Sequence, residues 1–328
     1  MALIEQVKGL KEKRALVVGD AMLDHNVHGA CTRLSPEGPY KVLHVQDHEF
    51  LLGGAANVAH NMAALGASTT LCYVAGADEA GKRLEETAKR KGLDVLAIKD
   101  DGRKTVEKIR LFAGDIRMDP RIDEESVHGI EKDIETEVVA RVKGELSRVH
   151  VLLLSDYNKG MFKGSLARKL IDEARKQGVL VVVEPKPSSF APELNKFDKA
   201  NVVIMNNKEA STITGIAYDG EESLNAMGEK VLGTAEFDYV VITCGKDGMF
   251  CMDKEGRTCM IKTKARKVSD VTGAGDTSAA ILSLAIAAGL QIEDALRVAN
   301  YGAGIVVGKP GTATVTLEEL KERIGQDT

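Results

Sequence analysis

A glycine-rich turn followed by an aspartate is the stretch of this sequence best suited to chemistry on a phosphoryl group. It reads DVTGAGDT over residues 270–277 and leads into an apolar run. Glycines let backbone N–H groups converge, and a helix amino end adds partial positive charge, so Gly273, Ala274 and Gly275 would form an anion hole. Asp276 would then accept the proton of an attacking hydroxyl. A helix-capping aspartate on a glycine turn explains the same segment, and taken alone the segment favours that explanation.

Further groups of polar residues and glycines follow predicted strands elsewhere in the chain. They are Asp24; Gly53, Gly54 and Asn57; Asn206 and Glu209; and Thr243, Gly245 and Gly248. In an open parallel sheet, ligands bind beyond the carboxyl ends of the strands. We therefore expect these groups to meet the glycine turn at one edge of the sheet.

The elements that must position these residues alternate between strands and helices. Short apolar runs such as 15–18 and 149–156 predict buried strands, and segments such as 53–65 and 274–288 predict helices. This alternation predicts an α/β fold with a doubly wound, mostly parallel central sheet and helices on both faces. No linker-like segment divides the chain, so we expect one domain over residues 1–328.

Two segments depart from this alternation. Residues 25–50 and 103–123 alternate apolar with polar side chains and carry many charges, which is typical of half-exposed antiparallel strands. They predict a small β lid on the central sheet, and a lid of this kind excludes water from a reactive phosphoryl donor. Because a few strands leave an exposed edge, we expect a homodimer formed through the lid.

Composition and charge exclude several classes of protein. The net charge of −5 argues against a partner that is a nucleic acid. The longest apolar stretch is too short to cross a bilayer and the first residues carry charges, so we expect no membrane association and no signal peptide. Five scattered cysteines predict reduced thiols in a cytoplasmic protein. No Walker A or G-x-G-x-x-G motif follows a predicted strand, which disfavours P-loop and dinucleotide-binding proteins.

Two signatures together resemble those of the ribokinase-like (PfkB) carbohydrate kinases. The first is GGAANVAHNMAALGA at 53–67 and the second is DVTGAGDT at 270–277, and the resemblance covers essentially the whole chain. Within that family, the segments 19–45, 154–160 and 306–315 resemble bacterial D-glycero-β-D-manno-heptose 7-phosphate kinases. Members of that group stand alone or carry a nucleotidyltransferase domain after the kinase, and this chain resembles the stand-alone form.

The resemblance implies transfer of a phosphoryl group from ATP to the anomeric hydroxyl of heptose 7-phosphate, a step toward ADP-heptose for lipopolysaccharide. It makes Asp276 the catalytic base and residues 273–275 the anion hole. The implied substrate ligands are Asp24, Gly53, Gly54, Asn57, Lys108, Arg117 and Arg33. A satisfied buried aspartate, a helix cap and ordinary surface charge remain alternative explanations for these side chains.

The resemblance also implies a nucleotide site. Its implied residues are Asn206, Glu209, Thr243, Gly245, Gly248 and Lys186. Glu209 would hold Mg²⁺ through water, while Asp270 and Thr272 would hold K⁺ or form an ordinary capping loop. The family pattern has Asp-Pro-Lys where this chain has Glu184-Pro185-Lys186, so the carboxylate is one methylene longer. That change matters if the carboxylate positions Lys186 and not if it only orders a loop.

Two alternative functions remain open at the level of sequence. The chain could phosphorylate another sugar, sugar phosphate or nucleoside, or it could bind sugar or nucleotide without catalysis. A degenerate kinase is expected to have lost its base, and Asp276 is present, which favours an enzyme. The expected partners are a small sugar phosphate and ATP.

Overall fold

The computed structural model describes residues 3–187, 194–263 and 270–327. Within them, a nine-stranded sheet has the order β13-β12-β11-β10-β9-β8-β1-β4-β5. The seven strands from β11 to β5 in this order pair in parallel. Strand β12 is antiparallel to β11, and β13 is antiparallel to β12. The bounds are β1 Arg14–Gly19, β4 Ser68–Ala75, β5 Asp94–Lys99, β8 Val151–Asp156, β9 Leu180–Pro185, β10 Val202–Asn206, β11 Tyr239–Thr243, β12 Met249–Asp253 and β13 Thr258–Ile261.

Helices cover both faces of this sheet, as predicted. Alternate strand residues enter opposite cores: Ala15 and Val17 of β1 pack in one, and Leu16 and Val18 in the other. The first core includes α2 Ala55–Ala64, α3 Glu79–Arg90, α8 Ala274–Ala287, α9 Ile292–Val306 and α10 Leu317–Gly325. The second includes α4 Lys132–Leu146, α5 Leu166–Lys176, α6 Asn207–Thr214 and α7 Glu221–Leu232. The short helical turns are α1 Leu3–Gln6, η1 Val7–Glu12, η2 Leu194–Phe197 and η3 Gly245–Asp247.

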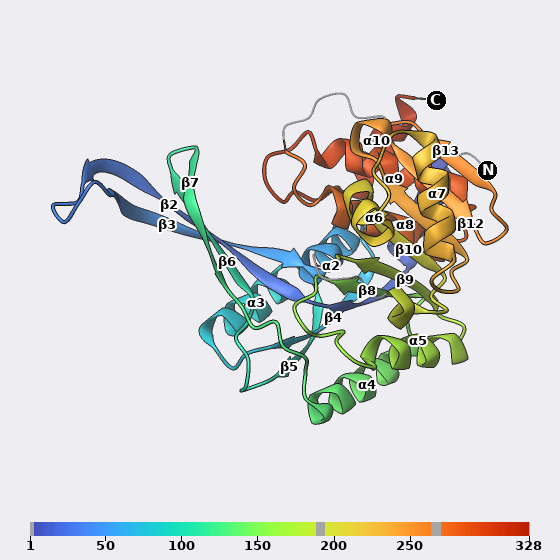
Figure 1. Ribbon diagram of the computed structural model, residues 1–328, viewed down its shortest axis with the longest axis horizontal. Coiled ribbons are helices and arrows are strands. Elements are labelled where there is room, and N and C mark those ends of the chain that lie inside the picture. Colours follow the sequence, from blue (N-terminus) through green and yellow to red (C-terminus); the bar gives the residue numbers. More distant parts are fainter. Residues whose placement is uncertain (1–2, 188–193, 264–269, 328) are drawn as a thin grey trace.

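A second sheet of four strands forms the predicted lid, with the order β3-β2-β6-β7. Its strands are β2 Ala21–Leu34, β3 Lys41–Gly54, β6 Glu107–Ala113 and β7 Ile116–Glu124. Figure 1 shows the β2–β3 hairpin extending well away from the body of the molecule. The lid begins earlier than the sequence pattern predicts because β2 starts two residues after β1 ends.

The lid joins the central sheet at the carboxyl end of its parallel strands. Gly19 of β1 pairs with Ser155 of β8, which pairs with Glu184 of β9, so the ends of these strands lie in one row. At the other junction, Gly54 has a φ of 57° between β3 and α2, and a Cβ there would lie 2.4 Å from the Asp20 carbonyl oxygen. A glycine is therefore required where the lid returns to the core.

None of the helices in the described ranges combines the length and apolar character needed to cross a membrane.

Candidate active site

Asp276 lies in the first turn of α8, buried, with both carboxylate oxygens held. Helix α8 starts at Ala274, directly after Gly273, whose φ is 81°. The Asn57 side-chain amide, from α2, donates to Oδ2 of Asp276 at 2.7 Å, and the Tyr157 hydroxyl donates to Oδ1 at 2.5 Å. The sequence-predicted base and the predicted Asn57 are thus in direct contact.

The amino end of α8 offers backbone donors next to Asp276. The amide of Ala274 makes a long 3.3 Å bond to the Val271 carbonyl. The amides of Gly275 and Asp276 have no acceptor within the helix, because the residues four positions before them, 271 and 272, lie ahead of the first residue of α8. These amides, with the helix dipole, are suited to bind the oxygens of a phosphoryl group. The predicted anion hole at Gly273, Ala274 and Gly275 stays a prediction, and the amide of Asp276 lies directly beside it.

Lys186 places a positive charge at the same point. Its Nζ would lie 3.6 Å from a Cβ built on Gly275, so the ammonium borders the turn. It contacts Glu184 Oε1 at 2.8 Å and Glu209 Oε1 at 3.3 Å. Burial opposes the charge of Lys186, but Glu184, Glu209 and Asp276 outweigh burial and raise its pKa. Lys186 is therefore a permanent cation beside the anion hole.

Glu184 is the residue at which this chain departs from the family pattern. It is 2% exposed, and it accepts a 3.2 Å bond from the Ser155 hydroxyl in addition to its contact with Lys186. Burial, with a smaller contribution from Asp276, raises the pKa of Glu184 to about 7 against the opposing charge of Lys186. The longer carboxylate thus touches Lys186 directly and does not only order a loop.

Asn206 and Glu209 form a capping box at the start of α6. Asn206 Oδ1 accepts the Glu209 amide at 2.8 Å, and Glu209 Oε2 accepts the Asn206 amide at 2.7 Å. The second oxygen of Glu209 faces Lys186. No cluster of three metal-binding side chains occurs in the described ranges. A magnesium ion that arrives with nucleotide phosphates needs few protein ligands, so Glu209 alone fits the predicted water-mediated role.

Three of the six predicted nucleotide residues line one cavity of about 270 Å³, and Asn206, Glu209 and Lys186 are not among its lining residues. Thr243, Gly245 and Gly248 line one side of it, and Ala274 and Gly275 line the end toward α8. Residues of α9 form much of the remaining wall; they are Asn300, Ala303 and Gly304. No sequence pattern predicted that these three residues line a cavity, since they are mostly small residues within a helix. The cavity thus runs from the anion hole to a mostly apolar wall suited to a planar base.

On the lid, Asp24 of β2 is buried. Its Oδ1 accepts a 2.9 Å ion pair from Arg110 Nη1 of β6. A Cβ on Gly53 would lie 3.2 Å from the carboxylate of Asp24, so glycine leaves room for it. The alternation of apolar and polar residues did not distinguish Arg110 from the other charged lid residues, so the sequence did not predict its ion pair with Asp24.

Lys108 is a cation without an ion-pair partner among the described residues. Its Nζ lies 5.9 Å from the centre of the Tyr157 ring. Burial lowers the pKa of Lys108, Asp24 opposes that effect, and the charges of Lys159 and Arg121 add to it. The latter two have ion pairs of their own with Glu125 and Asp123. Lys108 is therefore a lid cation that an anionic substrate could pair with.

The remaining predicted residues lie apart from this centre. Hydrogen bonds from Thr272, followed by the bond from the Gly311 amide, lower the pKa of Asp270, and the charge of Arg117, exposed on β7, adds a smaller effect. Asp270 accepts amides at 2.9 and 3.2 Å, so its carboxylate ties two loops together. Arg33 lies nine positions beyond Asp24 on β2, which is about 30 Å at the rise of a strand. Within one chain, Arg33 does not meet the other predicted ligands.

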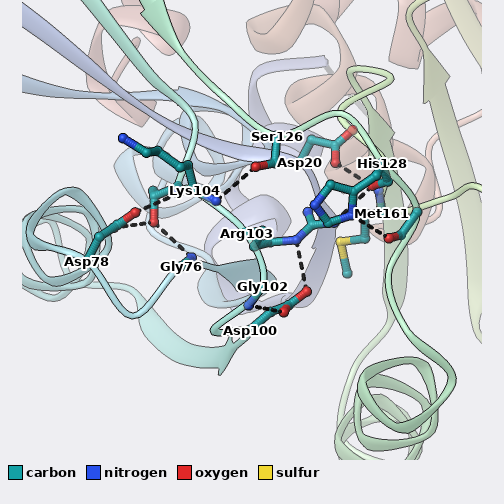
Figure 2. A network of polar contacts seen from close by, with 12 residues as sticks. Asp20, Gly76, Asp78, Asp100, Gly102, Arg103, Lys104, Ser126, His128 and Met161 are labelled. Atoms are coloured by element: carbon teal, nitrogen blue, oxygen red, sulfur yellow. Dashed lines mark hydrogen bonds and ion pairs between the residues drawn. The ribbon is translucent and has the colours of Figure 1, made fainter.

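A polar network anchors the β6–β7 half of the lid to the core. Arg103 donates to Asp100 at 3.2 Å and to the His128 carbonyl at 3.0 Å, and the Lys104 amide donates to the Ser126 hydroxyl at 2.9 Å (Figure 2). These bonds join the segment before β6 to the segment after β7. We call residues 125–128 the lid foot.

The sequence of the chain is similar to those of known carbohydrate kinases. Residues 12–320 match the family described as pfkB family carbohydrate kinase. The chain is 40% identical over 316 residues to the bifunctional protein HldE of Geotalea uraniireducens, with 96% of this chain and 64% of the relative covered. It is 42% identical over 312 residues to HldE of Geobacter sulfurreducens, with 95% and 63% covered. The chain therefore spans less than two thirds of the length of these relatives.

Solved structures show the same fold at low sequence identity. Phosphofructokinase-2 of Escherichia coli, in complex with potassium, superposes with a TM-score of 0.76 at 19% identity, covering 96% of this chain and 98% of that one. Ribokinase of Arabidopsis thaliana, complexed with ribose and ATP, gives 0.74 at 20% identity, covering 95% and 98%. The fold is thus ribokinase-like. With the family match over nearly its whole length, the chain belongs to the pfkB family of carbohydrate kinases.

Proposed function

We propose that this kinase transfers the γ-phosphoryl group of ATP to the anomeric hydroxyl of D-glycero-β-D-manno-heptose 7-phosphate. The products are the 1,7-bisphosphate and ADP, and the step would supply an ADP-heptose precursor of lipopolysaccharide in the cytoplasm. The sequence resemblance to heptose 7-phosphate kinases and the identity of about 40% to HldE proteins support the proposal. The observation that carries the substrate class is the unpaired Lys108 on the lid, because a sugar phosphate brings an anion to meet it.

The contacts at α8 suit the chemistry of this step. A bond forms from the sugar oxygen to the γ-phosphorus, the bond to the β-phosphate oxygen breaks, and Asp276 takes the hydroxyl proton. An anomeric hydroxyl is more acidic than an ordinary alcohol, so a carboxylate is a sufficient base. The Gly275 and Asp276 amides and Lys186 would stabilise charge on the transferred group. Mg²⁺, when bound near Glu209, would neutralise charge on the nucleotide phosphates.

A dimer through the lid is part of the proposal. Leu34, Tyr40 and Ile116 are exposed on the lid, with 61%, 65% and 72% of their surface accessible. The lid also has two edge strands, β3 and β7. Pairing two lids would cover both features. K⁺ binding at Asp270 and Thr272 stays a prediction.

Turnover with a panel of acceptors tests the proposal. Purified protein is incubated with ATP, Mg²⁺ and either heptose 7-phosphate, ribose, fructose 6-phosphate, fructose 1-phosphate or a nucleoside, and ADP release is measured. ³¹P NMR of the product should show a new phosphate on the anomeric carbon of the heptose. If the heptose phosphate is left unchanged while another acceptor is used, the substrate assignment fails and the family assignment stands.

The variant D276N distinguishes the enzyme from a binding protein. It should lose about 10²- to 10⁴-fold in kcat while it still binds ATP. The half-buried Asp294 of α9, which pairs with Arg297 of its own helix, provides a matched control, D294N, which should keep full activity. Full turnover by D276N would contradict the role of Asp276.

A further inference from the structure

We infer that Tyr157 is the positioning residue that fixes the Asp276 carboxylate for proton abstraction, and that it joins this carboxylate to the lid foot. The inference rests on the proposed kinase reaction. Tyr157 lies in the loop that follows β8. It falls within the segment 154–160 that resembles the heptose 7-phosphate kinases, but that resemblance assigned no role to the tyrosine. The assignment depends on three sets of contacts, those of its hydroxyl, its ring and its loop.

The Tyr157 hydroxyl is a donor to the base. It lies 2.5 Å from Oδ1 of Asp276, while Asn57 holds Oδ2. Burial, followed by the charge of Asp276, raises the pKa of Tyr157 well above its usual range. The phenol therefore stays protonated at working pH and donates to an ionised carboxylate. Donors on both oxygens fix the plane of the carboxylate and favour its charged form.

The ring of Tyr157 lies between the nucleotide side and the lid side of the site. Lys186 Nζ is 5.3 Å from the ring centre and Lys108 Nζ is 5.9 Å from it. Both distances fall within the range of a cation–π contact. Tyr157 thus contacts Lys186 beside the first turn of α8, Lys108 of the lid, and the Asp276 carboxylate.

The backbone on either side of Tyr157 is tied to the end of β1. Asp20 accepts the Lys159 amide at 2.9 Å and the Met161 amide at 3.3 Å, and Figure 2 shows Asp20 beside Met161. Asp156 accepts the Asn158 amide at 2.8 Å. Burial, together with Asp156, raises the pKa of Asp20 to about 7. Two buried acids, Asp20 and Asp156, thus hold the loop that follows β8 in place.

The same loop also packs directly on the lid foot. Lys159 Nζ pairs with Glu125 Oε2 at 2.7 Å, and Lys163 Nζ donates to the Val127 carbonyl at 2.7 Å. A Cβ on Gly160 would lie 1.9 Å from the His128 carbonyl oxygen, so the two backbones touch there. A displacement of the lid foot therefore reaches Tyr157 through a few bonds, and Tyr157 passes it to Asp276.

The variant Y157F tests this inference, because it keeps the ring and removes only the hydroxyl. Tyr73 of β4 provides a matched control, since its buried hydroxyl has no partner among the described residues. Steady-state kinetics with heptose 7-phosphate, over a range of pH, are compared for wild type, Y157F and Y73F. In parallel, each protein is labelled with ¹³C at aspartate Cγ, and the Asp276 resonance is assigned by its absence from D276N. Thermal unfolding confirms that the variants fold.

For Y157F we expect kcat to fall about 10- to 100-fold, with the sugar KM changed less than about threefold. The acidic limb of the rate profile and the NMR midpoint of Asp276 should both move to higher pH, because the ionised carboxylate has lost a donor. Y73F should match wild type. The other charged groups that face Tyr157 are Glu184, Lys186, Glu209 and Lys108, and all are unchanged in Y157F.

The two readouts separate the inference from the proposed function. If wild type phosphorylates no heptose phosphate but the Asp276 midpoint moves in Y157F, the proposed substrate is wrong and the positioning contact stands. If the NMR titration midpoint of Asp276 is the same in Y157F as in wild type, the inference is wrong, whichever sugar the kinase phosphorylates. A change in KM alone, with kcat at the wild-type level, overturns it as well, since Tyr157 would then contact substrate instead of orienting the base.

Discussion

Asn57 donates a 2.7 Å hydrogen bond to Asp276, a residue 219 positions later in the chain. The contact joins the first turns of α2 and α8, and each of these helices starts within one of the two glycine signatures. Thr277, next to Asp276, donates a 2.8 Å bond to Asn61, one turn further along α2. The two signatures are therefore one structural unit, in which the helix that follows the lid holds the base in place.

Replacing Lys108 should separate sugar phosphates from neutral sugars. In K108M we expect the KM for heptose 7-phosphate to rise about 10- to 100-fold, because a charge-assisted contact to the distal phosphate is lost. The KM for a sugar without that phosphate should change much less. Initial-rate measurements with both acceptors check this. K104M removes an exposed lysine paired with Glu124 and should have no effect; equal losses for both acceptors would contradict the assignment.

Adding a methyl group at Gly275 should block the anion hole without unfolding the protein. A Cβ there lies at ordinary contact distance, 3.6 Å, from Lys186 Nζ, so G275A should keep its melting temperature. Turnover should fall by about 10²-fold, because the methyl group occupies the approach of the phosphoryl group. The control is G144A in α4, where a Cβ meets nothing within 4 Å. A fully active G275A would show that the phosphoryl group binds elsewhere.

Glu184 should make stability depend on pH. Its pKa is raised from 4.5 to about 7 by burial, so the folded chain binds the proton more tightly than the unfolded chain. The stability that the protonated Glu184 contributes is therefore fully present below about pH 4.5 and is lost as the pH rises to about 7. E184Q cannot ionise, so its unfolding free energy should exceed that of wild type by on the order of 1–3 kcal/mol at pH 8 and match it at low pH. Urea denaturation from pH 4 to pH 8 measures the difference, and a constant difference would refute it.

The lid surface should hold two copies of the chain together. Sedimentation velocity at micromolar concentration is expected to show a dimer. Y40E and I116E place charges on exposed apolar lid positions and should shift the population toward monomer. Q177E, at the end of α5, serves as the surface control. A monomeric wild type would contradict association through the lid.

The sequence predicted elements and loops better than it predicted contacts. Alternating apolar runs indicated the parallel strands and their helices, and the family signatures indicated which loops carry the site. The structure brings Asp276 into contact with Asn57 and places Thr243, Gly245 and Gly248 around one cavity, while the roles of these residues stay predictions. These features depend on local pattern, which a single sequence carries.

The missed residues share a physical cause. Arg110 and Tyr157 act through bonds to Asp24 and Asp276, residues 86 and 119 positions away. Periodicity shows that a side chain faces one side of a strand or follows its end, but not which distant group it meets. The capping box of Asn206 and Glu209 is the reverse case, since its two hydrogen bonds join residues only three positions apart.

The direct passage from β1 into β2 has a consequence for protein engineering. Only Asp20 separates the core strand from the lid strand, and Gly54 joins the lid to α2 with no intervening residue. A lid from a related kinase therefore cannot be grafted here as a detachable module. Any exchange has its splice points next to Asp20, which supports the Tyr157 loop, and Asn57, which supports the base. Acceptor specificity and turnover should consequently change together in chimeras, and designs that retain residues 19–24 and 53–57 offer the best prospect of separating them.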